Sequence, residues 1–325
     1  MVPPRLKPGD EIRVIAPARS RAFVMENDNT RWADQRFHAM GVHVTFGAHV
    51  DERDVFDSSS IESRVGDLHA AFADPRVAAV MVVIGGYNSN ELLPHLDWDL
   101  IAHHPKVFCG YSDATALQNA ILARTGLVTY SGPHWSTFGM RDHFEPTGVW
   151  FTRAVFSDEP MSVTSSPTYS DDPWFVDQDA RTIVPSPGWL VLQDGVASGH
   201  IVGGNLCTLN LLQGTEWMPR LSGSLLFLED DQLSSGPEFA RNLTSLLQLA
   251  DAHGVTGLVL GRFQDASRVT TEQLQEMVRR QPALLGKPVL AGVDFGHTSP
   301  MITFPLGGRA ELATQPAPVL RITRH

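Results

Sequence analysis

The sequence contains few cysteines and no long apolar run. Cys109 and Cys207 are the only two cysteines among 325 residues, and both lie in apolar stretches. Because two isolated cysteines form no disulfide framework, we expect both thiols to be reduced and buried. The N-terminus lacks the apolar core of a signal peptide, and no apolar run is long enough to span a membrane. We therefore expect a cytoplasmic protein with no membrane partner.

Common metal and nucleotide motifs are also missing. Neither His-Glu-x-x-His nor Cys-x-x-Cys occurs, and the 13 histidines lack ligand spacing, so no metal site is expected. Gly203-Gly204-Asn205 has the spacing of neither a dinucleotide loop nor a Walker loop, although such a turn can hold an anion at a helix N-terminus. The formal net charge of -11 argues against nucleic acid as the main partner.

The first 160 residues alternate between short apolar runs and helical patterns. The Val-rich run 78–84 is typical of a strand buried on both faces of a parallel sheet. Ser59 and Glu62 have the spacing of a capping box that opens a helix. This alternation predicts an N-terminal α/β domain over residues 1–160. The expected strands are 11–17, 42–46, 78–84, 106–110 and 127–131, and the expected helices are 29–40, 59–72, 90–96 and 113–124.

The pattern changes after residue 160. Residues 161–188 are rich in Pro, Ser and Asp and predict a connecting loop of the kind that often covers a binding site. Residues 189–325 predict a second, mixed β/α domain. Its expected strands are 189–192, 199–202, 224–228, 255–260, 289–293, 302–304, 310–312 and 319–323, and its expected helices are 203–212, 237–252 and 271–280.

Ser112 is the first candidate for chemistry. It follows a predicted strand and precedes a predicted helix, and the small residues Gly110 and Ala114 flank it, as in a nucleophile elbow. The amides of Gly86 and Asp113 are then candidate donors to an oxyanion. Two alternatives remain open, because Ser112 could simply cap the helix and the Gly85-Gly86 pair could simply form a turn.

A nucleophilic serine needs a base and an orienting acid. His297 follows a predicted strand in a loop that contains a glycine, and Glu229 ends another predicted strand. Asp230 competes with Glu229 for the same role. His103, His104 and His134 also lie near strand ends, and any single histidine is more often a surface residue than a base. Trp174 and Trp189, in or beside the connecting loop, could stack on a ring of a ligand or could pin the loop to the core.

Several segments together resemble the LD-carboxypeptidase family of serine peptidases. They are IGGYNSNELLPHLDWDLI, FCGYSDATAL, TYSGPHWSTFGM, GGNLCTLNLLQGTEWMP, LLFLEDD and DFGHTSPMITFPLGG, spread over nearly the whole chain. Within the family the chain looks closest to the microcin C resistance (MccF-like) branch. The resemblance implies a flavodoxin-like N-terminal domain, a C-terminal swivelling β/α domain, a site between them, a homodimer and no cofactor.

The resemblance also implies residue roles and a substrate class. Ser112 is the implied nucleophile, His297 the base and Glu229 the acid, and Gly86 and Asp113 supply the oxyanion hole. The MccF-like branch cleaves the bond between an aminoacyl or peptidyl group and a nucleotide-like moiety, and the other branch removes D-alanine from murein tetrapeptides. Substrate-binding roles fall on Trp174, with Trp189 as runner-up, and on Asn88.

Two other interpretations of the sequence compete with a serine peptidase that uses Ser112. Cys109 could act as a thiol nucleophile on the same elbow, although its place inside a strand should point it into the core. The chain could instead be a two-domain ligand-binding protein that uses the cleft between its domains without turnover. A covalent adduct of a serine-reactive probe at Ser112 separates the enzyme from this binding protein.

Overall fold

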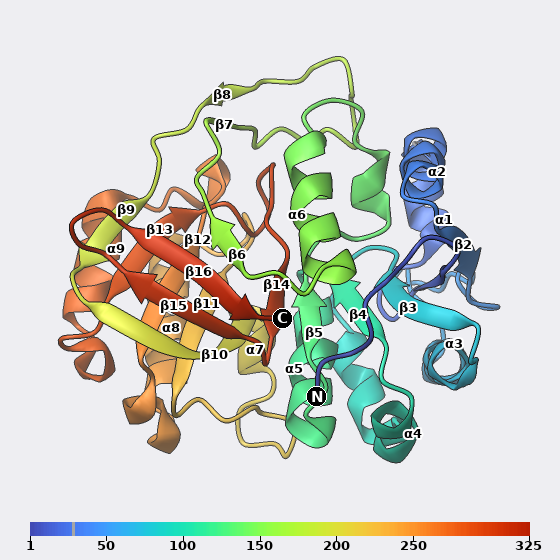
Figure 1. Ribbon diagram of the computed structural model, residues 1–325, viewed down its shortest axis with the longest axis horizontal. Helices are drawn as coiled ribbons and strands as arrows, with labels where there is room; N and C mark the ends of the chain where they lie inside the picture. The colour runs from blue at the N-terminus through green and yellow to red at the C-terminus, as the bar shows by residue number, and fades with distance from the viewer. Residues whose placement is uncertain (28–29) are drawn as a thin grey trace.

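The protein is built on two large sheets that lie side by side with helices between and around them (Figure 1). This architecture comes from a computed structural model that describes residues 1–27 and 30–325. The blue and green elements of the first half surround one sheet, and the yellow to red elements of the second half surround the other (Figure 1). The predicted start of one helix at residue 29 lies outside the described residues.

The first sheet has six strands in the order β14-β5-β4-β3-β1-β2. The five strands from the first half are parallel, and β14 pairs antiparallel with β5. Their order is that of a flavodoxin-like fold, in which the chain reverses direction across the sheet between β1 and β3. The predicted α/β fold is confirmed. These strands are β1 (Glu11–Ile15), β2 (His43–Phe46), β3 (Val77–Val82), β4 (Val107–Gly110), β5 (Thr129–Ser131) and β14 (Phe304–Leu306).

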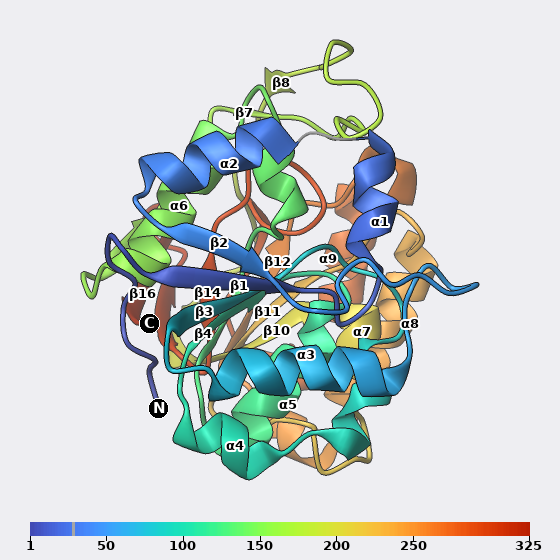
Figure 2. The ribbon, with the colours of Figure 1, turned by 90° about the vertical axis from the view of Figure 1, so that its right-hand side faces the viewer.

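Helices cover both faces of this sheet. Figure 2 shows α2 and α6 above it and α3, α4 and α5 below it. The sequence reading missed α6, because its first turn contains Pro146, which resembles a helix breaker although a helix tolerates proline there. The helices are α1 (Arg21–Val24), α2 (Thr30–Ala39), α3 (Ile61–Ala73), α4 (Trp98–His103), α5 (Ala114–Thr125) and α6 (Glu145–Phe156), with 3-10 turns at Met25–Asn27, Ser89–His95 and Ser136–Gly139.

The second sheet has eight strands in the order β6-β16-β15-β10-β11-β12-β13-β9. Its centre, β10 to β13, is parallel, and antiparallel strands extend both edges. The strands are β6 (Met161–Val163), β9 (Leu190–Gln193), β10 (Val196–Asn205), β11 (Ser224–Glu229), β12 (Gly257–Gly261), β13 (Val289–Val293), β15 (Arg309–Ala313) and β16 (Val319–Arg324).

Short helices and a long connection complete the second half. The helices are α7 (Leu206–Asn210), α8 (Gly236–Leu247) and α9 (Thr271–Arg279), with 3-10 turns at Ala250–Gly254, Asp265–Ser267 and Pro282–Leu284. The small strands β7 (Thr168–Tyr169) and β8 (Val184–Pro185) pair with each other, and the chain between them arches over the gap between the halves (Figure 1).

Three local predictions are wrong. The helix α3 is capped by Ser60, whose side chain accepts a hydrogen bond from the Ser63 amide, and not by Ser59. The helix predicted from Gly203 begins only at Leu206 with Asn205 as its cap, because Gly203 and Gly204 continue β10 and pair with Phe227 and Leu228 of β11. A Cβ at Gly203 would lie 1.8 Å from the Phe227 carbonyl oxygen, which explains the glycine. Cys207 is exposed, because it lies on the short helix that follows β10, whereas Cys109 is buried as expected.

Polar side chains of α5 join the two sheets. This helix follows Ser112, and its first two turns are buried from Ala114 to Ile121. The Asn119 side-chain amide donates to the Gly203 carbonyl at 2.8 Å, and the Asn205 amide donates to Thr115 Oγ1 at 3.0 Å. The helix therefore fixes the end of β10 against the elbow of the other half.

We predict that Asn119→Ala lowers the free energy of unfolding by about 1–3 kcal/mol, because it leaves the buried Gly203 carbonyl without its donor. Urea denaturation measures the change. Asn90→Ala is the control, since the Asn90 side chain bonds to no described residue, and its effect should stay within about 0.5 kcal/mol. Equal effects of the two substitutions would contradict the role assigned to Asn119.

Candidate active site

A cleft of about 740 Å³ opens where loops of the two halves meet. The first half contributes Arg19 after β1, Gly86 after β3 and Ser112 after β4, and the second half contributes Asp231 after β11 and His297 after β13. All five follow the carboxyl ends of strands, and β1 and β3 flank the point where the strand order reverses. Ligands of open α/β sheets bind at such a point.

Ser112 occupies a strained turn between β4 and α5. Its φ of 57° lies in the left-handed region, which residues other than glycine rarely adopt. A Cβ at Gly110 would lie 3.0 Å from Val82 and 3.1 Å from the Ala114 Cβ, and a Cβ at Gly85 would lie 3.0 Å from Ser112 Oγ. The elbow therefore has the geometry that the sequence predicts, with small residues where larger ones would not fit.

The two candidate oxyanion donors have free amides. Neither the Gly86 N–H nor the Asp113 N–H donates a hydrogen bond within residues 1–27 and 30–325. The Asp113 side chain is buried, and its Oδ2 accepts from the Ser89 amide at 2.9 Å. Burial raises the pKa of Asp113 against the effect of these hydrogen bonds. This anchoring fixes the turn that carries the Asp113 amide.

His297 and Glu229 form a hydrogen-bonded pair. His297 Nδ1 lies 2.8 Å from Glu229 Oε2, and the Glu229 side chain is 4% exposed against 17% for His297. A carboxylate at Nδ1 directs the other ring nitrogen, Nε2, to act on a partner. His297 lines the same cleft as Ser112, so an imidazole oriented by a carboxylate and a serine hydroxyl belong to one cavity.

Two glycines make room for the Glu229 carboxylate. A Cβ at Gly261 would lie 2.8 Å from the Glu229 Cβ, and a Cβ at Gly296 would lie 2.8 Å from Glu229 Oε2. Gly296 also has a φ of +107°, which strains any residue with a side chain. The glycine before His297 is therefore needed for the approach of the acid, as its place in the sequence suggested.

Asp230, the competing acid, has a different partner. Its Oδ1 accepts from the Asn205 side-chain amide at 3.2 Å, and the residue is 1% exposed. Burial, together with the nearby Glu229 charge, raises the pKa of Asp230 to about 6. The structure therefore brings Glu229, and not Asp230, to the histidine ring.

Competing effects act on the His297 imidazole. Burial lowers its pKa, but the charge and hydrogen bond of Glu229, with Asp231 and Asp230 behind it, raise the pKa more, so the net shift is upward. The Tyr111 ring packs edge-on against it at 5.2 Å. The protein thus stabilises the imidazolium that proton abstraction from a serine would create.

His134 is an uncharged residue that packs on Tyr111, the neighbour of His297. Its ring stacks on Tyr111 at 4.1 Å, and its Nε2 lies 2.9 Å from the Tyr111 carbonyl oxygen. Burial lowers the pKa of His134 to about 3, so the ring stays uncharged. Sequence reasoning noted His134 without a role, and only the fold reveals that it lies beside the cleft residues.

The other predicted site residues differ in where they lie. Trp174 is half-buried and lines the cleft, whereas Trp189 and Asn88 do not line it. Both tryptophans pack against the core, and the Asn88 carbonyl accepts from Arg64 at 3.0 Å. Cys109 is 1% exposed and burial raises its thiol pKa, which disfavours it as a nucleophile.

Arg19 and Tyr87 are cleft residues that sequence reasoning missed. The signal for Arg19 was its place directly after the first strand, in a loop at the carboxyl edge of the sheet. Within the described chain no group of three or more potential metal ligands occurs, and no helix there is long and apolar enough to cross a membrane.

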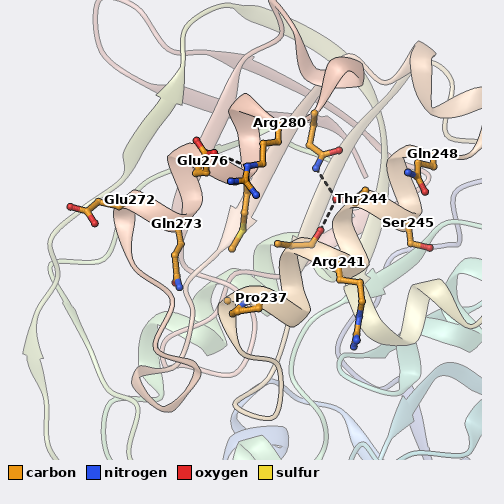
Figure 3. Close-up of a pocket in the computed structure, with 13 residues that line it drawn as sticks. Pro237, Arg241, Thr244, Ser245, Gln248, Glu272, Gln273, Glu276 and Arg280 are labelled. Atoms are coloured by element: carbon orange, nitrogen blue, oxygen red, sulfur yellow. Dashed lines mark hydrogen bonds and ion pairs between the residues drawn. The ribbon is translucent and has the colours of Figure 1, made fainter.

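A second pocket, of about 830 Å³, lies between α8 and α9 (Figure 3). Glu276 pairs with Arg280 along α9, and Gln281 donates to Thr244 Oγ1 of α8 at 2.8 Å. It shares no lining residue with the cleft, and none of the predicted site residues lines it. The candidate chemistry is therefore confined to the cleft.

Comparison with known sequences supports one family. Residues 12–132 match the LD-carboxypeptidase N-terminal domain, and residues 198–312 match the LD-carboxypeptidase C-terminal domain. YocD of Bacillus subtilis is 47% identical over 95% of this chain and 94% of its own length. The microcin C7 self-immunity protein MccF of Escherichia coli is 32% identical over 82% of this chain and 80% of its own. The murein tetrapeptide carboxypeptidase of Pseudomonas aeruginosa is 28% identical over 93% and 92%.

Comparison with solved structures supports the same family. An MccF-like protein from Bacillus anthracis superposes with a TM-score of 0.97 at 48% identity, and the match covers 100% of both chains. MccF in complex with glutamyl sulfamoyl guanosine superposes with a TM-score of 0.89 at 28% identity over 99% of this chain and 98% of that one. Fold and relatives together define a peptidase of the mixed α/β class. The chain belongs to the LD-carboxypeptidase family.

We predict that Glu229→Gln lowers the pKa of His297. The substitution removes the charge that raises this pKa and leaves the burial that lowers it. Because the imidazole acts as a base only when neutral, the low-pH limb of any activity that depends on it should move to lower pH, with a reduced plateau. NMR titration of the His297 ring measures the shift without a substrate. A pKa that is unchanged or higher in the variant would contradict the assigned pair.

Proposed function

We propose that the protein is a serine peptidase that hydrolyses the amide-type bond between an aminoacyl or peptidyl group and a nucleotide-like moiety. Such an activity inactivates toxins of the microcin C type. The observation that carries the proposal is the 2.8 Å pair of His297 and the buried Glu229, whose histidine lines the same cleft as Ser112 on its strained turn.

The proposed mechanism assigns each group one task. His297 removes the proton of Ser112 as its Oγ attacks the scissile carbonyl, and Glu229 orients the imidazole and stabilises its charged form. The amides of Gly86 and Asp113 donate to the oxyanion, and removal of one such donor typically costs about 10²–10³ in rate. The imidazolium then protonates the leaving nitrogen. Water, deprotonated by the same histidine, attacks the acyl-serine and releases the acid.

The nucleotide-like leaving group is proposed on the likeness to MccF, which has been solved with glutamyl sulfamoyl guanosine and with aspartyl sulfamoyl adenosine. Trp174 is proposed to stack on the base, since it lines the cleft from the connecting loop. The alternative substrate is a murein tetrapeptide that loses its terminal D-alanine, and the Pseudomonas aeruginosa relative supports it.

The proposal extends to assembly and location. We propose a cytoplasmic homodimer that needs no cofactor, with functional units at 1–160 and 189–325 and a connecting loop at 161–188. The second unit supplies β14 to the first sheet, and the start of the connecting loop supplies β6 to the second sheet. Sedimentation of the purified protein tests the dimer.

We predict that Ser112→Ala lowers kcat/KM by a factor of about 10³ or more, as loss of a triad nucleophile does. The assay uses glutamyl sulfamoyl adenosine and a murein tetrapeptide, with product identification by mass spectrometry. Faster turnover of the first supports the nucleotide-like substrate, and faster turnover of the second supports the alternative. Ser245→Ala, in the pocket between α8 and α9, is the control that should retain activity. Unchanged hydrolysis by the Ser112 variant would refute the proposed function.

A further inference from the structure

Arg19 lies next to the proposed oxyanion loop. It belongs to the short connection between β1 and α1, and its amide donates to the Gly85 carbonyl at 3.3 Å. A Cβ at Gly86 would lie 3.0 Å from the Arg19 nitrogen, so the two backbones are in close contact. The Arg19 side chain therefore begins beside Gly86, whose amide is a proposed donor to the reacting carbonyl.

Aromatic rings orient the Arg19 guanidinium. Its Cζ lies 4.8 Å from the centroid of the Phe23 ring and 5.1 Å from that of the Tyr87 ring. Such contacts stabilise the cation through its faces and leave the N–H donors in its plane free. The described part of the chain offers these donors no hydrogen-bond or ion-pair partner. Nearby Arg21 differs, because it binds the Asp51 carboxylate through two nitrogens.

The acidic residues of the cleft do not neutralise Arg19. Glu26 pairs with Arg53 at 2.5 Å, and Asp172 pairs with Arg181 at 2.7 Å. Among the described residues that line the cleft, Arg19 is the only lysine or arginine. A half-buried guanidinium with oriented, unused donors at a reaction site is suited to bind an anion.

We propose that Arg19 binds a negatively charged group on the leaving-group side of the substrate. The inference rests on the proposed function and adds a specificity residue to it. In an acyl sulfamoyl nucleoside the charge lies on the acyl sulfamate, directly at the scissile nitrogen. In a murein tetrapeptide it is the carboxylate of the leaving D-alanine, one carbon farther away. Both sources present an anion within a few bonds of the carbonyl that Gly86 would polarise.

The charges in the rest of the cleft favour an anion beside Arg19. Asp231 lines the cleft on the side of His297, and its charge contributes to the raised pKa of that histidine. An anion bound beside Asp231 would be repelled, whereas one beside Arg19 is attracted. Arg19 thus selects for substrates whose leaving group is charged.

The test compares matched charged and neutral substrates. One pair is alanyl sulfamoyl adenosine and the neutral amide of alanine with 5′-amino-5′-deoxyadenosine, and the other is a murein tetrapeptide and its C-terminal amide. We predict that Arg19→Gln lowers kcat/KM for the charged member about tenfold or more and for the neutral member less than about twofold. The pair that shows the effect identifies the source of the anion. Arg21→Gln, outside the cleft, is the matched control.

Other outcomes separate the two proposals. Equal losses for charged and neutral members, or a loss confined to a glutamyl rather than an alanyl acyl group, would overturn the role of Arg19 while Ser112-dependent hydrolysis stands. If the wild type hydrolyses none of the substrates, the proposed function fails. Calorimetry then tests the role of Arg19 by itself: the charged substrates should bind to the wild type more tightly than to the Arg19→Gln variant. Arg19→Lys, which keeps the charge without the planar fork, should restore part of the loss and checks against misfolding.

Discussion

The hydrogen bond between His297 and Glu229 is the interaction on which the rest of the site depends. Glu229 is 3% exposed, and a carboxylate buried without a partner is costly. Its partner comes from another strand end, and the bond needs Gly261 and Gly296 to admit the carboxylate. The same bond fixes one nitrogen of the imidazole and raises its pKa. The burial of Glu229, the glycine positions that admit it and the basicity of His297 therefore all depend on this one hydrogen bond.

Ser112 follows a strand of one sheet and His297 a strand of the other, so the cleft that both line exists only because the sheets are docked. α5 leaves the elbow at Ser112 and bonds through Thr115 and Asn119 to the end of β10. β14 returns from the second half to pair with β5, a few residues after His297. The chain between these two connections carries Glu229 and His297. A change that loosens α5 should therefore disturb the site without touching it.

Sequence reasoning succeeded where the physical cause is local. Valine-rich runs predicted the parallel strands, and the small residues around Ser112 predicted its turn. It was incomplete where the cause is distant. The choice of Glu229 over Asp230 depends on which carboxylate faces His297, and one of the two aromatic partners of Arg19, Tyr87, lies in a distant segment of the chain. The start of the helix after Gly203 was misplaced because the pairing that keeps Gly203 and Gly204 in β10 comes from another strand, β11.

The central claim is that His297 and Glu229 activate Ser112 across the cleft. The most direct measurement is the rate at which a fluorophosphonate probe labels Ser112 as a function of pH, located by mass spectrometry. The account predicts a single adduct on Ser112, formed at a rate that rises with pH through the pKa of His297 measured by NMR, and almost no labelling in His297→Ala. Labelling on another residue, or at the same rate in His297→Ala, would contradict it.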